Sequence, residues 1–297
     1  MWSTIAADFR SHFGAFNTVF TESSGEGAGL ALEAAKAGHR FIIACGGDGT
    51  INEVMNGILE SGTDTELGVL PSGTGGDFRR FIGMSNKTKD AATQLRTGRS
   101  EYIDIGKVDY IDTRGQLASR YFINISSIGI GASIATRVAR SEFLKWLPLT
   151  GAARGRARFA ASTLEEALDL QPFDVKVRVD DGPETLLRTI ALCICNSSNF
   201  GGGMNIAPDA RNDDGLLDIV GIGDIGLRKI VTAAPRLYGK GILGIEGVTS
   251  GRAAKLHAES ADGRIVPLET DGEVVGSLPA TYQVLPGKLK VRIPSDK

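Results

Sequence analysis

Two glycine-rich turns, each following a short apolar run, carry hydroxyl and carboxylate groups at matching places. Residues 46–50 read Gly-Gly-Asp-Gly-Thr, and residues 72–77 read Ser-Gly-Thr-Gly-Gly-Asp. Glycine allows a backbone to approach a ligand closely, and N–H groups in such turns and at helix starts bind phosphate oxygens. The two turns therefore predict a phosphate-binding site, with contacts from Gly46, Gly47, Gly49, Thr50, Ser72, Gly73, Thr74 and Asp77.

An aspartate stands in each turn, Asp48 in the first and Asp77 in the second. A carboxylate beside a bound phosphate is repelled unless Mg²⁺ lies between them or unless the carboxylate handles a proton. The two positions therefore indicate metal-assisted or proton-transfer chemistry. Neither turn contains the Walker A pattern or the dinucleotide-binding glycine pattern, which disfavours a P-loop NTPase and a Rossmann dehydrogenase.

The elements around these turns change in character along the chain. Before about residue 100, helical patterns alternate with short β-rich runs such as 41–45 and 67–71, which favours parallel strands with helical crossovers. Later residues read mainly as strands separated by turns, with one helical pattern at 155–169. We expect an α/β domain over residues 1–104, rejoined by residues 284–297, and a β-rich, mostly antiparallel domain over residues 105–283.

Composition excludes several classes of protein. The 297 residues carry 33 Lys+Arg and 35 Asp+Glu, so no basic field would recruit nucleic acid. No apolar run approaches the roughly 20 residues that a membrane-spanning helix requires. The three cysteines lie in apolar runs, as reduced core residues do. We expect a cytoplasmic protein.

Several motifs together resemble the diacylglycerol-kinase catalytic-domain family, which includes bacterial lipid kinases and sphingosine kinases. The glycine turns lie within GGDGTINEVMNG (46–57) and PSGTGGDF (71–78), which look like the signature pair of that family. Further matches follow in order over nearly the whole chain. They are YIDIG (102–106), FINISSIGIGASI (122–134), CNSSNFGGGMNIAPDARNDDGLLDI (195–219) and LETDGE (268–273).

The resemblance implies a two-domain fold with ATP in the cleft between the domains, Mg²⁺ dependence, and phosphoryl transfer to a lipid alcohol such as diacylglycerol. It implies a structural Mg²⁺ held by the Asp214 carboxylate and the main-chain oxygens of Arg211 and Leu216, with Asp104 in the surrounding polar network. Asp271 resembles the proposed base of the bacterial members.

The proton acceptor is a choice between two aspartates, because members of the family differ on which one takes this role. We favour Asp271 as the base, with Glu273 helping to orient it, and Asp48 for organising Mg²⁺ and phosphate. The chain departs from the family pattern in having Gly76 where asparagine is usual. It also begins at a helical pattern, after the point where the family has a first strand and an Asn-Pro loop.

Two alternatives stay open beside the lipid kinase: a kinase of the same fold acting on a soluble alcohol, and a nucleotide-binding protein without catalysis. The segment 143–159 joins apolar residues to Arg154, Arg156 and Arg158, which fits either a buried loop or a contact with an anionic membrane surface. We expect peripheral membrane association in the latter case. The sequence does not name the lipid, and a homodimer stays open.

Overall fold

The computed structural model describes residues 2–72, 76–129, 171–226, 229, 232, 234–239 and 241–295. The chain divides into two compact units, Met1–Ile103 with Gly287–Lys297, and Asp104–Pro286. Asp104, placed by the sequence analysis at the end of the first domain, belongs to the second unit. The long strands β3 (Arg99–Asp112) and β14 (Glu273–Ile293) contribute residues to both units.

The first unit is an α/β structure, as the sequence predicts. Its helices and remaining strands are α1 (Trp2–Phe13), α2 (Glu26–Lys36), β1 (Phe41–Gly46), α3 (Asp48–Ser61), β2 (Glu66–Pro71), α4 (Asp77–Phe81) and α5 (Thr88–Thr97). Strands β1 and β2 pair in parallel, and the end of β14 pairs in parallel with β2 through Val291 and Leu67. The carboxyl ends of β1 and β2 therefore lie at one edge of the sheet, and both glycine turns leave from it.

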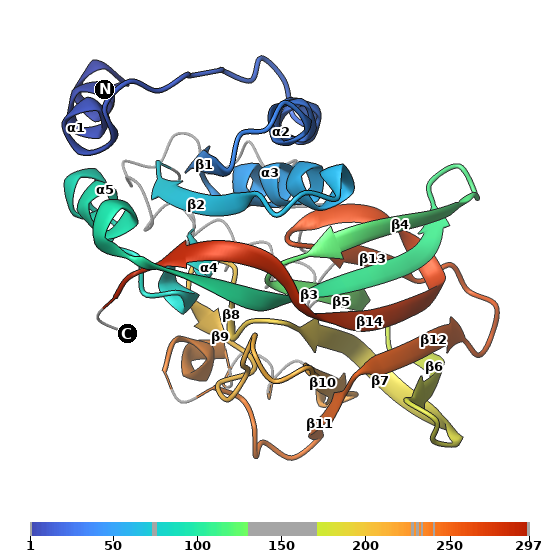
Figure 1. Ribbon diagram of the computed structural model, residues 1–297. Coiled ribbons are helices and arrows are strands. Elements are labelled where there is room, and N and C mark those ends of the chain that lie inside the picture. The colour runs from blue at the N-terminus through green and yellow to red at the C-terminus, as the bar shows by residue number, and fades with distance from the viewer. Residues whose placement is uncertain are drawn as a thin grey trace, which may run out of the picture. The chain divides into compact units, whose positions relative to one another are not determined.

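Helices α2 and α3 lie side by side in the first unit (Figure 1), and Gly57 sets how closely they approach. A Cβ atom on Gly57 would lie 2.1 Å from the carbonyl oxygen of Ala28 and 2.9 Å from Cβ of Ala31. No side chain fits at that separation, so glycine is required by packing. The neighbouring face of α3 is buried through residues such as Ile51, Met55 and Ile58.

The second unit is built from antiparallel strands. They comprise parts of β3 and β14 together with β4 (Leu117–Phe122), β5 (Ile125–Gly129), β6 (Phe173–Val179), β7 (Glu184–Cys195), β8 (Asn199–Phe200), β9 (Met204–Asn205), β10 (Leu217–Gly223), β11 (Val248–Ala253), β12 (Lys255–Ser260) and β13 (Pro267–Thr270), with a 3₁₀ turn at Ala234–Tyr238. Strand pairings within this unit are antiparallel throughout the described residues. The predicted β-rich second domain is thus confirmed.

Two runs that the sequence suggests as single strands are interrupted, for one physical reason. The run 120–130 (RYFINISSIGI) breaks between β4 and β5, where the N–H groups of Ile123 and Asn124 donate to the Asp271 carboxylate. The run 251–260 breaks at Ala254, where the N–H groups of Ala254 and Lys255 donate to Asp180. An aspartate side chain thus replaces a neighbouring strand as the hydrogen-bond acceptor. The helix expected at 155–169 and the arginine-rich segment 143–159 lie outside the described residues.

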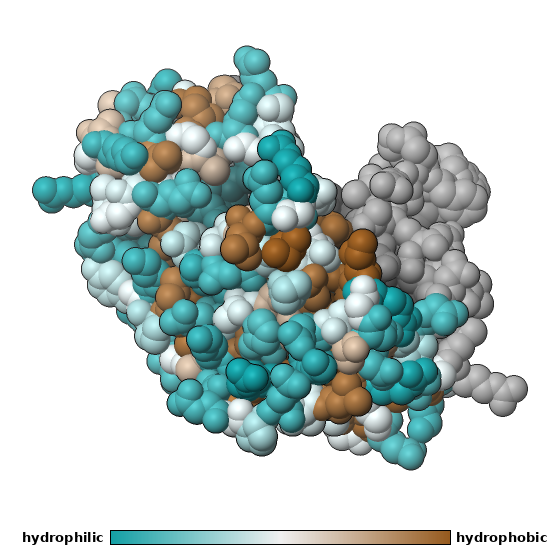
Figure 2. Space-filling view, turned by 90° about the vertical axis from the view of Figure 1, so that its right-hand side faces the viewer, coloured by the Kyte–Doolittle hydropathy of each residue, from teal (hydrophilic) through white to brown (hydrophobic). Residues whose placement is uncertain are grey.

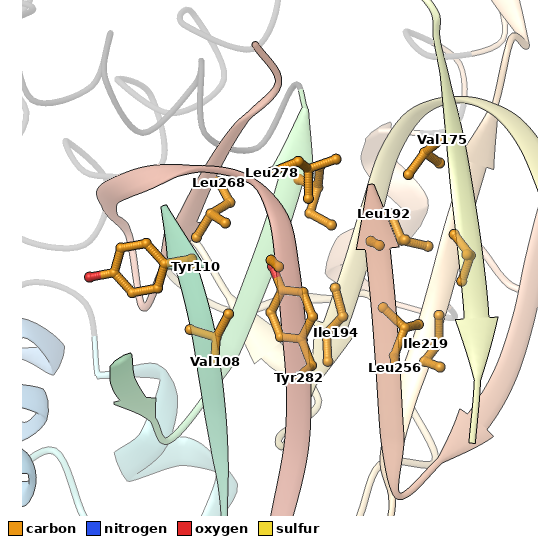
Figure 3. Close-up of a cluster of buried hydrophobic side chains, with 14 of the residues drawn as sticks. Val108, Tyr110, Val175, Leu192, Ile194, Ile219, Leu256, Leu268, Leu278 and Tyr282 are labelled. Atoms are coloured by element: carbon orange, nitrogen blue, oxygen red, sulfur yellow. The ribbon is translucent and has the colours of Figure 1, made fainter. Parts of the chain in front are cut away.

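The core of the second unit is a cluster of buried side chains from successive strands (Figure 3). Alternate residues point into it, such as Val108 and Tyr110 on β3 and Leu192 and Ile194 on β7, as the two-residue period of a strand requires. Tyr282 on β14 is fully buried, and its hydroxyl lies 3.3 Å from Oγ of Ser126. This core holds β5, β7, β13 and β14 in register.

The molecular face in Figure 2 is mostly hydrophilic with interspersed hydrophobic groups. Among the helices that the structure describes, none has the length and apolar character needed to cross a membrane.

Replacing Gly57 by alanine is expected to lower the free energy of unfolding by about 2 kcal/mol, because the added methyl group overlaps Ala28 of the facing helix. Gly29 on α2 is the matched control, since a Cβ there has nothing within 4 Å. Gly29→Ala should stabilise the protein by about 0.5–1 kcal/mol through helix propensity. Urea unfolding measures both. Equal effects of the two changes would contradict the close helix contact.

Candidate active site

The two glycine turns of the first unit are joined at the sheet edge where they begin. Gly46 pairs with Pro71 at the ends of β1 and β2, and the N–H of Ser72 donates to the carbonyl oxygen of Gly46 at 3.2 Å. Helix α3 begins at Asp48, within the first glycine turn, so Asp48 and Thr50 lie at the start of the helix. The predicted contacts Gly73 and Thr74 lie in residues 73–75, outside the described residues.

Asp48 ties the second turn to the first. Its Oδ2 accepts hydrogen bonds from the N–H groups of Gly76 at 2.7 Å and Asp77 at 3.1 Å, and its Oδ1 accepts from Phe78 at 3.2 Å. These are N–H groups at the start of α4, which have no acceptor within their own helix. The geometry therefore gives Asp48 an organising role toward the second turn.

Gly76 and Gly46 have local reasons to be glycine. Gly76 has a φ of 85°, in the left-handed region that glycine adopts without strain and asparagine tolerates better than most residues. A Cβ on Gly46 would lie 2.4 Å from Oγ1 of Thr50. Close packing of Thr50 thus accounts for Gly46 without a ligand. Asp77 is buried and forms an ion pair with Arg80 at 2.9 Å.

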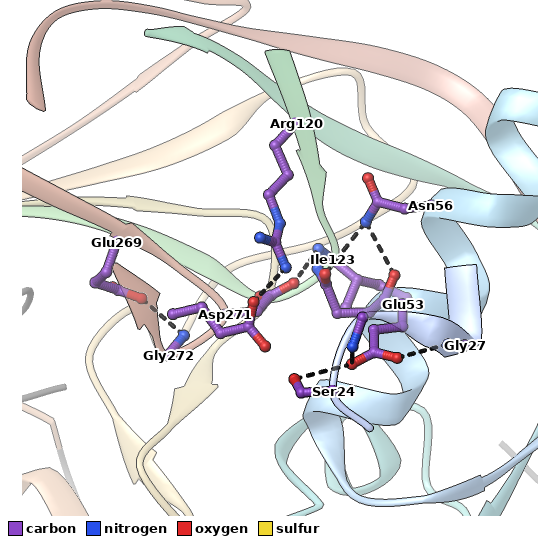
Figure 4. A network of polar contacts seen from close by, with 12 residues as sticks. Ser24, Gly27, Glu53, Asn56, Arg120, Ile123, Glu269, Asp271 and Gly272 are labelled. Atoms are coloured by element: carbon purple, nitrogen blue, oxygen red, sulfur yellow. Dashed lines mark hydrogen bonds and ion pairs between the residues drawn. The ribbon is translucent and has the colours of Figure 1, made fainter. Parts of the chain in front are cut away.

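In the second unit, Asp271 occupies the turn between β13 and β14 with a φ of 48° (Figure 4). Its Oδ2 accepts the N–H of Ile123 at 2.9 Å, and its Oδ1 accepts the N–H groups of Asn124 at 2.9 Å and Ile125 at 3.2 Å. Its own N–H donates to the carbonyl oxygen of Ile125. These backbone contacts fix the direction of the carboxylate.

Glu273, the predicted orienting partner of Asp271, forms an ion pair with Arg120 at 2.5 Å. Its side chain keeps 41% of its surface exposed. The contacts that orient Asp271 include the main-chain N–H groups of residues 123–125.

Glu269 is a buried carboxyl group that the sequence analysis did not single out. Its Oε1 accepts from Oγ of Ser127 at 2.5 Å, and its Oε2 accepts from the N–H of Gly272 at 2.7 Å. Burial, together with the neighbouring Asp271 charge, raises its pKa to about 7 against these hydrogen bonds. Glu269 lies opposite Ser127 in the β13–β5 pairing, and Leu268 and Thr270 on either side of it are buried too, so no two-residue period along β13 marks it in the sequence.

The loop proposed to hold Mg²⁺ is anchored by Asp104. The N–H of Asp104 donates to the carbonyl oxygen of Asn212 at 2.6 Å, and its Oδ2 accepts the N–H of Gly215 at 2.7 Å. Within the loop, Oδ1 of Asp214 accepts the N–H of Leu216 at 3.1 Å. The side chain of Arg211 forms an ion pair with Asp213. The main-chain oxygen of Arg211 is the group expected to bind the cation.

Negative charge gathers around that loop. Arg252 lies 3.3 Å from Oδ2 of Asp214 and 3.2 Å from Oδ1 of Asp218. Burial raises the pKa of Asp218; Arg252 opposes this, and the charges of Asp214 and Asp209 add to it. Oδ2 of Asp218 is buried without a hydrogen-bond partner among the described residues. A carboxylate oxygen of this kind is a ligand that a hard cation such as Mg²⁺ accepts. Within the described residues, no three acidic, histidine or cysteine side chains converge on one point, so main-chain oxygens would have to complete such a site.

Asn124 and Asn196 connect the Asp104 region to the Asp271 region, and the sequence analysis assigned neither a role. The carbonyl oxygen of Asn124 accepts the N–H groups of Asn196 at 2.8 Å and Ser197 at 3.0 Å. Nδ2 of Asn196 donates to the carbonyl oxygens of Asp104 at 2.9 Å and Ile123 at 3.0 Å. The motifs around 104, 124, 196 and 271, far apart in sequence, thus meet in one polar network.

Comparison with known proteins agrees with these motifs. Residues 1–108 match the model of the diacylglycerol kinase catalytic domain, and residues 124–293 match the model of the YegS C-terminal NAD kinase beta sandwich-like domain. A probable lipid kinase YegS-like of Pseudomonas syringae is 31% identical over 98% of this chain and 88% of its own length. A diacylglycerol kinase of Mycobacterium tuberculosis is 29% identical over 89% of this chain and 80% of its own.

Solved structures show the same fold. The crystal structure of a putative diacylglycerol kinase from Bacillus anthracis superposes with a TM-score of 0.75 at 22% identity, covering 99% of this chain and 92% of the other. The α/β domain followed by a β-rich domain is therefore an architecture already seen in solved proteins.

The raised pKa of Glu269 predicts a pH dependence of stability. The folded state keeps this proton up to about pH 7, whereas the unfolded chain releases it near its ordinary value of 4.5. The folded state therefore binds more protons in this window, and the free energy of unfolding falls as the pH rises through it. In Glu269→Gln, which keeps an acceptor for Gly272, the fall from about pH 5 to about pH 7.5 should be smaller by about 2 kcal/mol.

Denaturant unfolding across this pH range measures the difference. Glu259→Gln is the control, because the exposed Glu259 has a pKa lowered by Lys176 and titrates below the window. If the free energy of unfolding changes with pH equally in Glu269→Gln and in the parent, Glu269 is ionised over the whole pH range.

Proposed function

Because the chain belongs to the diacylglycerol kinase and YegS-like lipid kinase family, we propose that it transfers the γ-phosphoryl group of ATP to the hydroxyl of a lipid alcohol such as diacylglycerol. The observation that carries the proposal is the Asp271 carboxylate, held by three successive backbone N–H groups within the motif LETDGE. Such a carboxylate is oriented before any substrate arrives, as a base in phosphoryl transfer needs to be.

Asp271 is the proton acceptor in this proposal. Phosphoryl transfer depends mainly on positioning and charge stabilisation, and the attacking hydroxyl must also lose a proton. Asp48 is already committed to the N–H groups of Gly76, Asp77 and Phe78. Asp271 is held in the same way by the N–H groups of residues 123–125, so these contacts do not separate the two aspartates. The choice of Asp271 rests on the likeness of LETDGE to the motif that carries the proposed base in bacterial members of the family.

ATP would be bound by the turns after β1 and β2. Support comes from their shared sheet edge, from Asp48 fixing the second turn, and from the start of α3 at the first turn, where N–H groups attract anions. When bound, Mg²⁺ and ATP supply the transferable phosphoryl group and neutralise its charge. The chain's own part is to hold the phosphates and to orient the carboxylate of Asp271.

A second, structural Mg²⁺ would be held by the Asp214 carboxylate and the main-chain oxygens of Arg211 and Leu216. Support comes from the excess of carboxylates around Asp218 and from the clamp that Asp104 forms on Asn212 and Gly215. A lipid substrate also implies that the protein works at the cytoplasmic surface of a membrane, associated peripherally.

Asp271→Asn is expected to lower the rate of lipid phosphorylation by roughly two orders of magnitude or more, because the base is lost. The assay presents ATP, Mg²⁺ and a panel of long-chain alcohols in mixed micelles, with a soluble alcohol as comparison. ATP affinity, measured by calorimetry, should be retained.

Asp180→Asn is the matched control for Asp271→Asn. Asp180 also has a φ of 48° and also accepts two successive N–H groups, from Ala254 and Lys255. It should lose stability as the Asp271 variant does but keep the parent's rate. Normal turnover by Asp271→Asn, with Asp48→Asn inactive and still binding ATP, would transfer the role of base to Asp48. If only the soluble alcohol is phosphorylated, the acceptor is a soluble alcohol and not a lipid.

Asp214→Ala is expected to abolish the stabilisation of the fold by Mg²⁺, because the proposed cation loses its only charged ligand. Asp213→Ala is the control, since the neighbouring Asp213 is 55% exposed and forms an ion pair with Arg211. Melting temperatures recorded from chelator to excess Mg²⁺ give the comparison. Identical Mg²⁺ responses of the parent and Asp214→Ala would remove the metal from this loop.

A further inference from the structure

Buried side-chain atoms without a hydrogen-bond partner occur in two of the sequence motifs of the described chain, residues 195–219 and residues 268–273. Among the described residues, four such side-chain atoms occur: Oδ1 of Asn196, Oδ1 of Asn205, Oδ2 of Asp218 and Oγ1 of Thr270. The first three lie between residues 195 and 219: Asn196 directly follows β7, Asn205 ends β9, and Asp218 lies in β10, after the loop 209–216. Buried polar groups are nearly always hydrogen-bonded, so each of these atoms calls for a water or an ion.

Asn196 gives the clearest case. Its side chain is fully buried, and its Nδ2 donates to two carbonyl oxygens, those of Asp104 and Ile123. This pair of acceptors fixes which end of the amide is nitrogen, because the reversed amide would bring its oxygen against both carbonyls. Oδ1 is therefore the orphaned atom, and it can only accept a hydrogen bond or ligate a cation.

The fold links Asn196 to the cation loop through Asp104. Asn196 follows Cys195, which pairs with Asp218 on β10. Asp104, whose carbonyl oxygen receives Nδ2 of Asn196, also contacts Asn212 and Gly215 of the loop. Asn196 and the loop thus share Asp104 as a direct neighbour.

We propose that Oδ1 of Asn196 is a further ligand of the loop cation, either directly or through one bound water. The inference rests on the Mg²⁺ of the proposed function and adds a residue to it. An amide oxygen is a ligand that hard cations accept, and an acceptor of this kind repels phosphate and other anions. Asn196 then joins the cation to the backbone at Ile123, whose N–H holds Asp271. It is a positioning residue for that carboxylate.

The test compares Mg²⁺ affinities, obtained from the rise of the melting temperature of the full chain between chelator and excess Mg²⁺. Asn196→Ala should weaken the Mg²⁺ affinity by about 10-fold or more, the usual scale for groups that support a metal site. Ser197→Ala is the matched control, because Ser197 is equally buried and its Oγ donates to Oδ1 of Asn124. Its Mg²⁺ affinity should stay within a factor of about three of the parent's, below that scale.

The melting temperature of the double variant Asn196→Ala with Asp214→Ala should not rise with Mg²⁺. In the Asp214→Ala background, adding Asn196→Ala should lower the melting temperature by the same amount in Mg²⁺ as in chelator. A second measurement does not depend on any variant folding: in the parent labelled with ¹⁵N-asparagine, traces of Mn²⁺ should broaden the side-chain amide signal of Asn196. Together these results would support the inference.

Other results would overturn it. If Asn196→Ala melts lower by the same amount with and without Mg²⁺, Asn196 only bridges Asp104 and Ile123, while the cation at Asp214 stands. An Asn196 amide signal unaffected by Mn²⁺ has the same meaning. A parent that shows no Mg²⁺ response would remove the cation together with its proposed ligand, and the lipid-phosphorylation assay would then judge the kinase separately.

Discussion

Two aspartates bind three successive backbone N–H groups each, and the arrangement of both units depends on these contacts. Asp48 binds residues 76–78 in the first unit, and Asp271 binds residues 123–125 in the second. In both cases the N–H groups belong to backbone without a regular partner: the start of a helix, or a break between strands. A charged acceptor makes stronger hydrogen bonds than a neutral one, so each turn is held in one geometry.

The polar interior of the second unit follows from the Asp271 contact. Diverting the N–H groups of residues 123–125 to a side chain leaves the carbonyl oxygens of Ile123 and Asn124 to find donors elsewhere. The donors are the amide of Asn196 and the N–H groups of Asn196 and Ser197. The chain end of β7 is thereby fixed beside Asp104, and Asp104 in turn fixes the loop at 212–215.

Unfavourable electrostatics are concentrated at the same motifs. Burial raises the pKa of Glu269 to about 7 beside Asp271, and burial also raises the pKa of Asp218 near Asp214 and Asp209. Apolar side chains would serve stability better at such positions, whereas the surrounding core of Figure 3 is well packed. Sites that depart from the best packing and charge pairing are where function is to be sought.

The sequence by itself determined the class of the fold and the position of most elements, because periodicity and glycine turns are local properties. It also determined the family, since LETDGE and the glycine turns are specific as ordered motifs. Only the tertiary structure decided what each polar group contacts. Runs 120–130 and 251–260 read as continuous strands, yet they break because Asp271 and Asp180, distant in sequence, accept their N–H groups. The burial of Glu269 and the orphaned oxygen of Asn196 likewise depend on which strands meet, and hydrophobic patterns along one strand do not carry that information.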